Sequence, residues 1–185
     1  MSNQESVHTD FGELFARKIP EVFSSEANIE KVGELAYDNF KKYYGCSQSL
    51  IKAYLDILGL QDDFWFRALG GLQAGGCSGL TCGALNAGFI LISGIKGRRK
   101  IEDGFWGITP SFDPCQKLCK WFKLMYNSTV CSEISGYDWF DIPSVISGHL
   151  NPNPKQRERM ENCAMLTGGS ASKVAEILNG LLCKQ

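Results

Sequence analysis

The sequence predicts an all-α fold, a single-domain helical bundle in which a glycine-rich loop precedes a buried central helix. Apolar residues recur at helical spacing along the chain, as Val32, Ala36 and Phe40 do. Helix start and stop signals bracket most of these stretches, and no pair of segments shows a convincing strand-pairing pattern. A chain of 185 residues is long enough to bury one sizeable core.

Two parts are expected along the chain. Residues 1–27 form an N-terminal segment with one short helix, and residues 28–185 form a cysteine-rich helical domain. Residues 1–9 are polar and are expected to be disordered. Asp10 can cap the first helix, and Pro20 is expected to break it because proline lacks a backbone N–H.

Three further helices are expected in the first third of the chain. Gly45 is expected to end one of them in a left-handed conformation, and Asp62 or Asp63 can cap the last. Together with the first helix, the expected ranges are 10–17, 28–44, 46–59 and 62–69.

The segment at residues 70–97 differs in kind, because it holds nine glycines. Its first part, residues 70–79, is expected to be a loop rather than regular structure. Its second part, residues 81–95, is apolar, and its length favours a helix over the alternative, a strand. We expect a buried helix in which Gly83 and Gly88 let other backbones approach closely.

The second half of the chain is expected to continue with helices. Asp113 and Pro114 form a start signal, an N-cap followed by proline at the first helical position, for a helix that reaches Tyr126. A short element that closes at Gly136 follows it. Prolines then indicate a loop, and a glycine pair is expected to separate two final helices. The ranges of the loop and of these two helices are 137–155, 155–166 and 171–183.

The composition excludes several classes of partner. A net charge of −1 predicts no affinity for nucleic acid or anionic membranes. No run reaches 18 apolar residues, so membrane insertion is not expected. The polar start lacks the regions of a signal peptide, which indicates a cytoplasmic protein. Disulfides are usually transient in that compartment, which leaves metal or redox roles for the cysteines.

Eight cysteines are the main chemical feature of the chain, and no pair has the Cys-x-x-Cys spacing of zinc ribbons or thioredoxins. Cys46, Cys82 and Cys131 each lie at an expected turn or element boundary, beside glycine or small polar residues. A helix N-terminus lowers the pKa of a thiol and offers free N–H groups to the sulfur atoms of an anionic cluster. Iron–sulfur sites need several thiolates that converge where bulky side chains are absent, which these positions suit.

The other thiols and the two histidines carry weaker signals. Cys115 and Cys119 stand four residues apart on an expected helix, and the apolar residues on the same face favour core packing. Cys183 lies close to a helix end that is expected to fray, so no site role is expected for it. His149 is expected to be a surface residue in a loop, and His8 lies in the polar start.

Four segments, in this order, resemble the C_GCAxxG_C_C family, which is named for four cysteines and a CGAxxG motif. They are Tyr44-Gly45-Cys46-Ser47-Gln48-Ser49-Leu50, Thr81-Cys82-Gly83-Ala84 with the preceding glycines, Asn127 to Gly136 around Cys131, and Glu161-Asn162-Cys163-Ala164. One departure is Ala87, which stands where the motif has glycine and is also small. Cys77 is additional to the family's four cysteines.

The resemblance implies a redox role. Cys46, Cys82, Cys131 and Cys163 would bind a 2Fe–2S or 4Fe–4S cluster, and the protein would act in electron transfer or redox sensing with a redox protein partner. A related module occurs in split-Soret cytochrome c, a dimeric protein with haem and an iron–sulfur centre, so the analogy also implies a homodimer. This chain lacks the haem-attachment sequence, so only the cluster-bearing part carries over. We expect an electron carrier rather than an enzyme.

Two other uses of the thiols stay open. Cys77 and Cys82 could form a loop disulfide in a thiol–disulfide redox protein. Four cysteine ligands suit zinc equally well, which would make the chain a zinc-binding structural or interaction protein. Metal analysis separates zinc from iron, and a thiol titration tests the disulfide.

Overall fold

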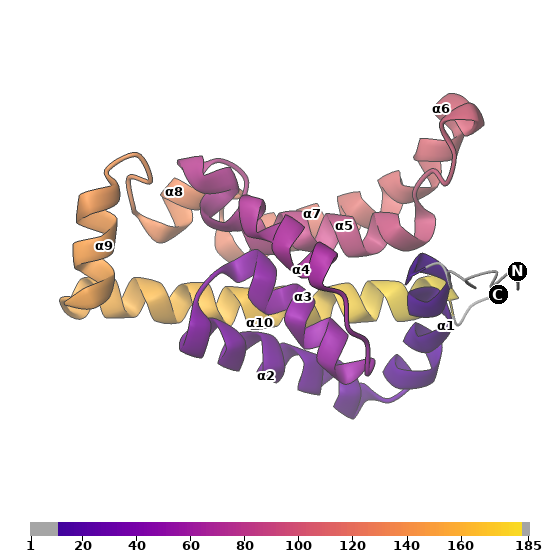
Figure 1. Ribbon diagram of the computed structural model, residues 1–185, viewed down its shortest axis with the longest axis horizontal. Helices are drawn as coiled ribbons and strands as arrows, with labels where there is room; N and C mark the ends of the chain where they lie inside the picture. Colours follow the sequence, from indigo (N-terminus) through magenta and orange to yellow (C-terminus); the bar gives the residue numbers. More distant parts are fainter. Residues whose placement is uncertain (1–10, 183–185) are drawn as a thin grey trace, which may run out of the picture.

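A computed structural model describes residues 11–182 of the chain, and it confirms the all-α fold (Figure 1). These residues contain no β-strand, although Thr81 and Val130 form an isolated antiparallel bridge. The helices are α1 (Phe11–Phe23), α2 (Glu26–Tyr43), α3 (Cys46–Ile57), α4 (Asp63–Ala68), α5 (Gly83–Lys96), α6 (Gly104–Ile108), α7 (Phe112–Tyr126), α8 (Cys131–Ser135), α9 (Ile142–Leu150) and α10 (Pro154–Leu182). The expectations for residues 1–9 with His8, for Asp10 as a cap and for Cys183 lie outside the described residues.

The long helix α10 runs the length of the molecule, and the other long helices pack against it (Figure 1). Helix α2 lies along one side of α10, and α3, α5 and α7 cover the rest of the core. Leu50, Leu118 and Leu178 are fully buried where these helices meet, and the Tyr54 hydroxyl donates a hydrogen bond to the carbonyl of Ala171 at 2.9 Å. None of the helices in the described part of the chain is long and apolar enough to cross a bilayer.

The prediction that a glycine pair separates two final helices is wrong. Helix α10 is continuous across Gly168 and Gly169. A Cβ atom at Gly168 would lie 2.8 Å from the carbonyl oxygen of Gly33 and 3.1 Å from Cβ of Tyr37, both in α2. The missing side chain therefore lets α2 and α10 approach closely, and it does not end the helix.

The prediction that Pro20 breaks the first helix is also wrong, because α1 continues through it to Phe23. A proline inside a helix costs roughly 3 kcal/mol. Ile19 and Phe23 lie on either side of Pro20 and are fully buried, and burial of each such side chain stabilises the fold by roughly 1.5–3 kcal/mol. Tertiary packing therefore offsets the proline.

The expected loop at residues 137–155 contains a helix, α9. The Asp141 side chain caps it by accepting a hydrogen bond from the backbone N–H of Ser144 at 3.2 Å. Pro143 stands in the first turn, where its missing N–H would have no partner inside the helix. The prolines therefore mark the start of a helix here.

The start signal before α7 lies two residues too late, because the N-cap is Ser111 and not Asp113. The helix begins at Phe112, so Asp113 lies in its first turn and does not cap it. The Asp113 carboxylate instead forms an ion pair with Lys117 at 2.7 Å, one turn along the helix.

Other expected elements are confirmed. Helices α2, α3, α4, α5 and α8 lie close to their expected ranges. Gly45 adopts the expected left-handed conformation with φ +73°, and the Asp62 side chain accepts a hydrogen bond from the N–H of Trp65 at 2.9 Å, as an N-cap does. Residues 70–79 are irregular as expected, although short 3₁₀ and π-type turns at Leu69–Leu72 and Gly75–Gly79 interrupt them.

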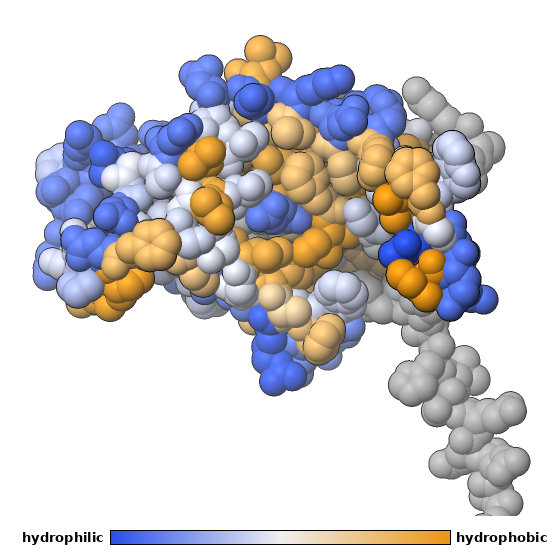
Figure 2. Space-filling model, turned by 90° about the horizontal axis from the view of Figure 1, so that it is seen from above, coloured by the Kyte–Doolittle hydropathy of each residue, from blue (hydrophilic) through white to orange (hydrophobic). Residues whose placement is uncertain are grey.

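A segment at residues 97–111, between α5 and α7, projects from the body of the bundle (Figure 1). It contains α6, which the sequence did not signal. Phe105 and Trp106 of this segment are 63 % and 79 % exposed. Figure 2 shows that apolar side chains gather across the adjoining face of the molecule.

Candidate functional site

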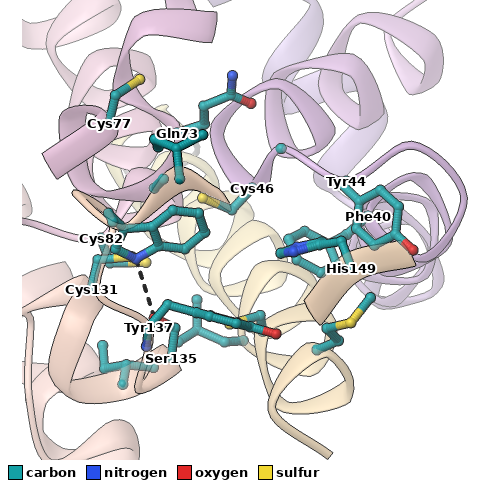
Figure 3. Close-up of a pocket in the computed structure, with 18 residues that line it drawn as sticks. Phe40, Tyr44, Cys46, Gln73, Cys77, Cys82, Cys131, Ser135, Tyr137 and His149 are labelled. Atoms are coloured by element: carbon teal, nitrogen blue, oxygen red, sulfur yellow. Dashed lines mark hydrogen bonds between the residues drawn. The ribbon is translucent and has the colours of Figure 1, made fainter. Parts of the chain in front are cut away.

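The four cysteines singled out in the sequence line one cavity of about 290 Å³ (Figure 3). They reach it from four different elements. Cys46 is the first residue of α3, Cys82 is the N-cap of α5, and Cys131 is the first residue of α8. Cys163 comes from within α10. Three of the thiols therefore lie at helix N-termini, where backbone N–H groups have no partner inside the helix.

Backbone hydrogen bonds hold Cys82 and Cys131 side by side. The N–H of Cys82 donates to the carbonyl of Thr129 at 2.8 Å, and the N–H of Cys131 donates to the carbonyl of Leu80 at 2.6 Å. Together with the bridge between Thr81 and Val130, these bonds join the end of the glycine-rich segment to the start of α8.

Two glycines leave room for the thiols. A Cβ atom at Gly83 would lie 2.7 Å from Sγ of Cys46 and 2.6 Å from the carbonyl oxygen of Leu72. A Cβ atom at Gly75 would lie 2.8 Å from Cβ of Cys131. Any larger residue at either position would displace a cysteine, so the sequence expectation of small residues around the thiols is met.

The glycine-rich segment beside the cavity follows an unusual backbone path. Residues 74–77 all have positive φ, and two of them, Ala74 and Cys77, are not glycine. This conformation costs roughly 1–2 kcal/mol for each residue that carries a Cβ atom. The turn places Cys77, which is exposed, at the wall of the same cavity.

Hydrogen bonds make Cys46 the most acidic of the four thiols. The Cys82 thiol donates a hydrogen bond to the Cys46 sulfur, which is the largest of the influences that lower the pKa of Cys46 from 9.0 to about 7. Burial opposes this shift, and the backbone N–H groups of Ala74, Ser47 and Ala84 support it.

The other three thiols stay protonated. As the donor to Cys46, and because it is buried, Cys82 has a pKa well above its ordinary value. Burial and then the Cys46 charge raise the pKa of Cys131 to about 11, and burial with the charges of Cys46 and Cys131 raises that of Cys163 to about 12. The prediction of lowered thiol pKa values at helix N-termini is therefore met at Cys46, although the Cys82 hydrogen bond contributes most to that shift. The prediction is wrong for Cys82, which donates a hydrogen bond to Cys46 and is buried, and for Cys131, where desolvation and the charge of Cys46 outweigh the helix.

The donor set fits an iron–sulfur cluster. Four thiols face one cavity, glycines keep bulky side chains away, and N–H groups surround Cys46. Within residues 11–182, no three or more His, Cys, Asp or Glu side chains are grouped closely enough to hold one metal ion. The four thiols come from separate elements of the fold, which suits a cofactor that presents several iron atoms.

Aromatic residues form much of the remaining wall, and no sequence pattern assigned them to the site. His149 was expected in a surface loop, but it belongs to α9 and lines the cavity. Its ring stacks on Tyr137 with centroids 5.4 Å apart and meets the edge of Tyr44 at 5.3 Å. Trp139 lines the cavity as well, and its indole N–H donates to Oγ of Ser135 at 3.3 Å (Figure 3). The only sequence feature that hints at this wall is the cluster of aromatic residues directly after Gly136. Its spacing matches no known binding motif, so the sequence alone gives it no function.

The remaining described cysteines lie outside the cavity. Cys115 packs against the core, as expected, and its Sγ lies 4.0 Å from Oγ of Ser93. Cys119 is partly buried on the same helix. The seven cysteines within the described residues are free, so Cys77 and Cys82 are not joined, and the thiol paired with Cys82 is Cys46.

Fold and site together define a helical protein with a buried centre of four cysteine thiols. A sequence model of one family, described as "putative redox-active protein (C_GCAxxG_C_C)", matches residues 44–177 and thus includes all four cysteines. The match covers more than half of the chain, and the chain belongs to this redox-active family. No curated protein and no solved structure matched the chain.

Proposed function

We propose that this protein binds an iron–sulfur cluster, 2Fe–2S or 4Fe–4S, through Cys46, Cys82, Cys131 and Cys163, and that it acts in electron transfer or redox sensing. One observation carries the proposal: cysteines from four separate elements line a single cavity. A bound cluster would supply one-electron redox chemistry.

The chain's own residues prepare the site unequally. Cys46, with a pKa of about 7, loses its proton first and offers the first thiolate, while Cys131 and Cys163 keep their protons to much higher pH and must lose them to become ligands. Cluster binding therefore releases protons and strengthens as pH rises. The described residues that line the cavity include no Asp, Glu, Lys or Arg, so the ligands lie in apolar surroundings that tune a cluster's potential.

The proposal includes a setting and partners. The protein would act in the cytoplasm, where thiols are kept reduced. The seven described cysteines, all of them free thiols, are compatible with this setting. A redox protein would exchange electrons at the cavity mouth, beside the exposed Cys77. A homodimer would cover the exposed Phe105 and Trp106 of the projecting segment.

Anaerobic purification with a visible spectrum and with iron, sulfide and zinc assays on one sample tests the proposal. Brown protein with matching iron and sulfide is the expected result. Colourless protein that contains zinc and takes up no iron or sulfide on reconstitution would contradict it and would favour the zinc-binding alternative.

A second function is favoured by the hydrogen bond between Cys82 and Cys46. These two thiols would form a disulfide by exchange with oxidised glutathione. The Cys46 thiolate attacks the glutathione disulfide and expels one glutathione thiolate, and Cys82, after losing its proton, attacks the mixed disulfide and expels the second. Thiol titration of metal-free protein should then lose two thiols after oxidation, in the wild type and in Cys119→Ser. A titration unchanged by the oxidant would exclude this function.

A further inference from the structure

The cavity has a second end, which lies away from Cys46, Cys82 and Cys131. Figure 3 shows Cys46, Cys82 and Cys131 on one side, and aromatic side chains on the other. We call this second region the aromatic end. It is formed by Phe40, Tyr44, Tyr137 and His149.

The aromatic end contains a buried hydroxyl without a partner. Tyr137 is only 9 % exposed, and its hydroxyl has no hydrogen-bond partner. In Figure 3 the Tyr137 ring extends toward the side of the cavity on which His149 lies. Buried hydroxyl groups are nearly always hydrogen-bonded, because burial without a partner forfeits the bond made to water. The Tyr137 hydroxyl is thus available to a ligand.

His149 supplies a complementary group. Its Nδ1 lies 2.8 Å from the carbonyl oxygen of Val145, which can only accept a hydrogen bond, so Nδ1 carries the proton and donates. In the neutral ring, Nε2 is then an acceptor. The stack of His149 on Tyr137 and the edge contact with Tyr44 hold the imidazole in place.

We propose that the aromatic end binds a small, uncharged, planar ring compound that carries a carbonyl oxygen, of the quinone class. The ligand is uncharged because no Asp, Glu, Lys or Arg is among the described residues that line the cavity, and Cys46 lies on its other side. It is planar because aromatic rings form the walls, and it carries a carbonyl because the Tyr137 hydroxyl can donate to one. The hydroxyl of the reduced ring would donate to Nε2 of His149. The choice of a redox-active ring rests on the proposed redox function, whereas the ligand's shape and polarity rest on the cavity alone.

Equilibrium dialysis with duroquinone under anaerobic conditions tests the proposal. All ring positions of this quinone are substituted, so thiols cannot add to it. The dialysis is run on cluster-loaded and on metal-free protein, and iron is assayed separately, so a missing cluster is not mistaken for a missing ligand. The variants are Tyr137→Phe, which keeps the ring, and Ile142→Trp, which fills the cavity from a half-exposed wall position. Tyr43→Phe is the control, because Tyr43 is 66 % exposed and lies outside the cavity.

The expected result is saturable binding of one duroquinone per chain. Tyr137→Phe should weaken it about five- to tenfold, the change expected for one lost hydrogen bond, and Ile142→Trp should abolish it. Tyr43→Phe should bind like the wild type, and durene, the same ring without carbonyl groups, should bind more weakly than duroquinone. Absence of binding to both forms of the wild type, or equal affinity in the wild type and Tyr137→Phe, would overturn the proposal.

Discussion

The thiol of Cys82 donates a hydrogen bond to the sulfur of Cys46, and this contact separates the acidities of two buried neighbours. It lowers the pKa of the acceptor to about 7 and raises that of the donor, so Cys46 is the thiol of this pair that ionises around neutral pH. The thiolate, and not the thiol, acts as nucleophile and as metal ligand. Cys46 is therefore the first of these cysteines able to attack a disulfide or to bind iron.

Replacement of Cys82 by alanine should raise the pKa of Cys46, because the largest influence that lowers it is removed. The pH profile of Cys46 alkylation by iodoacetamide, followed by mass spectrometry on metal-free protein, measures this. The wild-type profile should have its midpoint at about 7, and that of Cys82→Ala should lie at higher pH. Coincident profiles would show that the hydrogen bond does not control Cys46.

Ionisation of Cys46 should stabilise the metal-free protein increasingly between pH 7 and pH 9. Over this range Cys46 has lost its proton in the folded protein, where its pKa is about 7, but keeps it in the unfolded chain, whose ordinary value is 9.0. The unfolded state then binds more protons, so the free energy of unfolding increases with pH, by up to roughly 3 kcal/mol.

The other three thiols have the opposite effect, and above pH 9 they dominate, so the free energy of unfolding falls. The raised pKa values of Cys131 and Cys163, about 11 and 12, keep protons on the folded protein that the unfolded chain has lost. Urea denaturation at pH 6, 8.5 and 10 measures both limbs. In Cys46→Ser the free energy of unfolding should no longer increase above pH 7, but it should still decrease above pH 9. An increase as large as that of the wild type would contradict the assignment to Cys46.

Gly83→Ala should destabilise the fold and disturb the site, because the new Cβ atom meets the backbone oxygen of Leu72 and the sulfur of Cys46. Such overpacking typically costs about 1–3 kcal/mol. Gly94→Ala in the same helix is the matched control, since no atom lies within 4 Å of its Cβ position, and it should be neutral or stabilising by up to about 1 kcal/mol. Urea denaturation of both variants measures the difference, and equal midpoints would refute the close contact.

A parallel pair of variants tests the packing of α2 on α10. Gly168→Ala should lower the free energy of unfolding by about 1–3 kcal/mol, because its Cβ atom would lie 2.8 Å from the backbone oxygen of Gly33. Gly180→Ala, in the same helix and in open space, should not lower it. Thermal denaturation that ranks the two variants in the opposite order would contradict this packing.

The sequence predicted most of the helices, because helical spacing and caps are local signals. The sequence-based prediction was wrong where tertiary contacts determine whether a helix continues or ends. Pro20 is tolerated because its neighbours are buried, and Gly168 serves contact with a helix more than 100 residues away in the chain, which no local pattern reveals.

The site could be predicted in part. The resemblance to a family selected four cysteines, and the fold brings them to one cavity. Neither their unequal acidities nor the aromatic end could be predicted. Both depend on which groups meet in three dimensions, as the Cys46–Cys82 hydrogen bond and the stack of His149 on Tyr137 do.

The most direct test of the central claim is the iron and acid-labile sulfide content of serine variants purified anaerobically. Variants of Cys46, Cys82, Cys131 and Cys163 should each lose the visible spectrum and most of the iron and sulfide. Cys119→Ser, which lies on α7 outside the cavity, should retain them. Full iron and sulfide in Cys82→Ser would contradict the claim that these thiols form one cluster site.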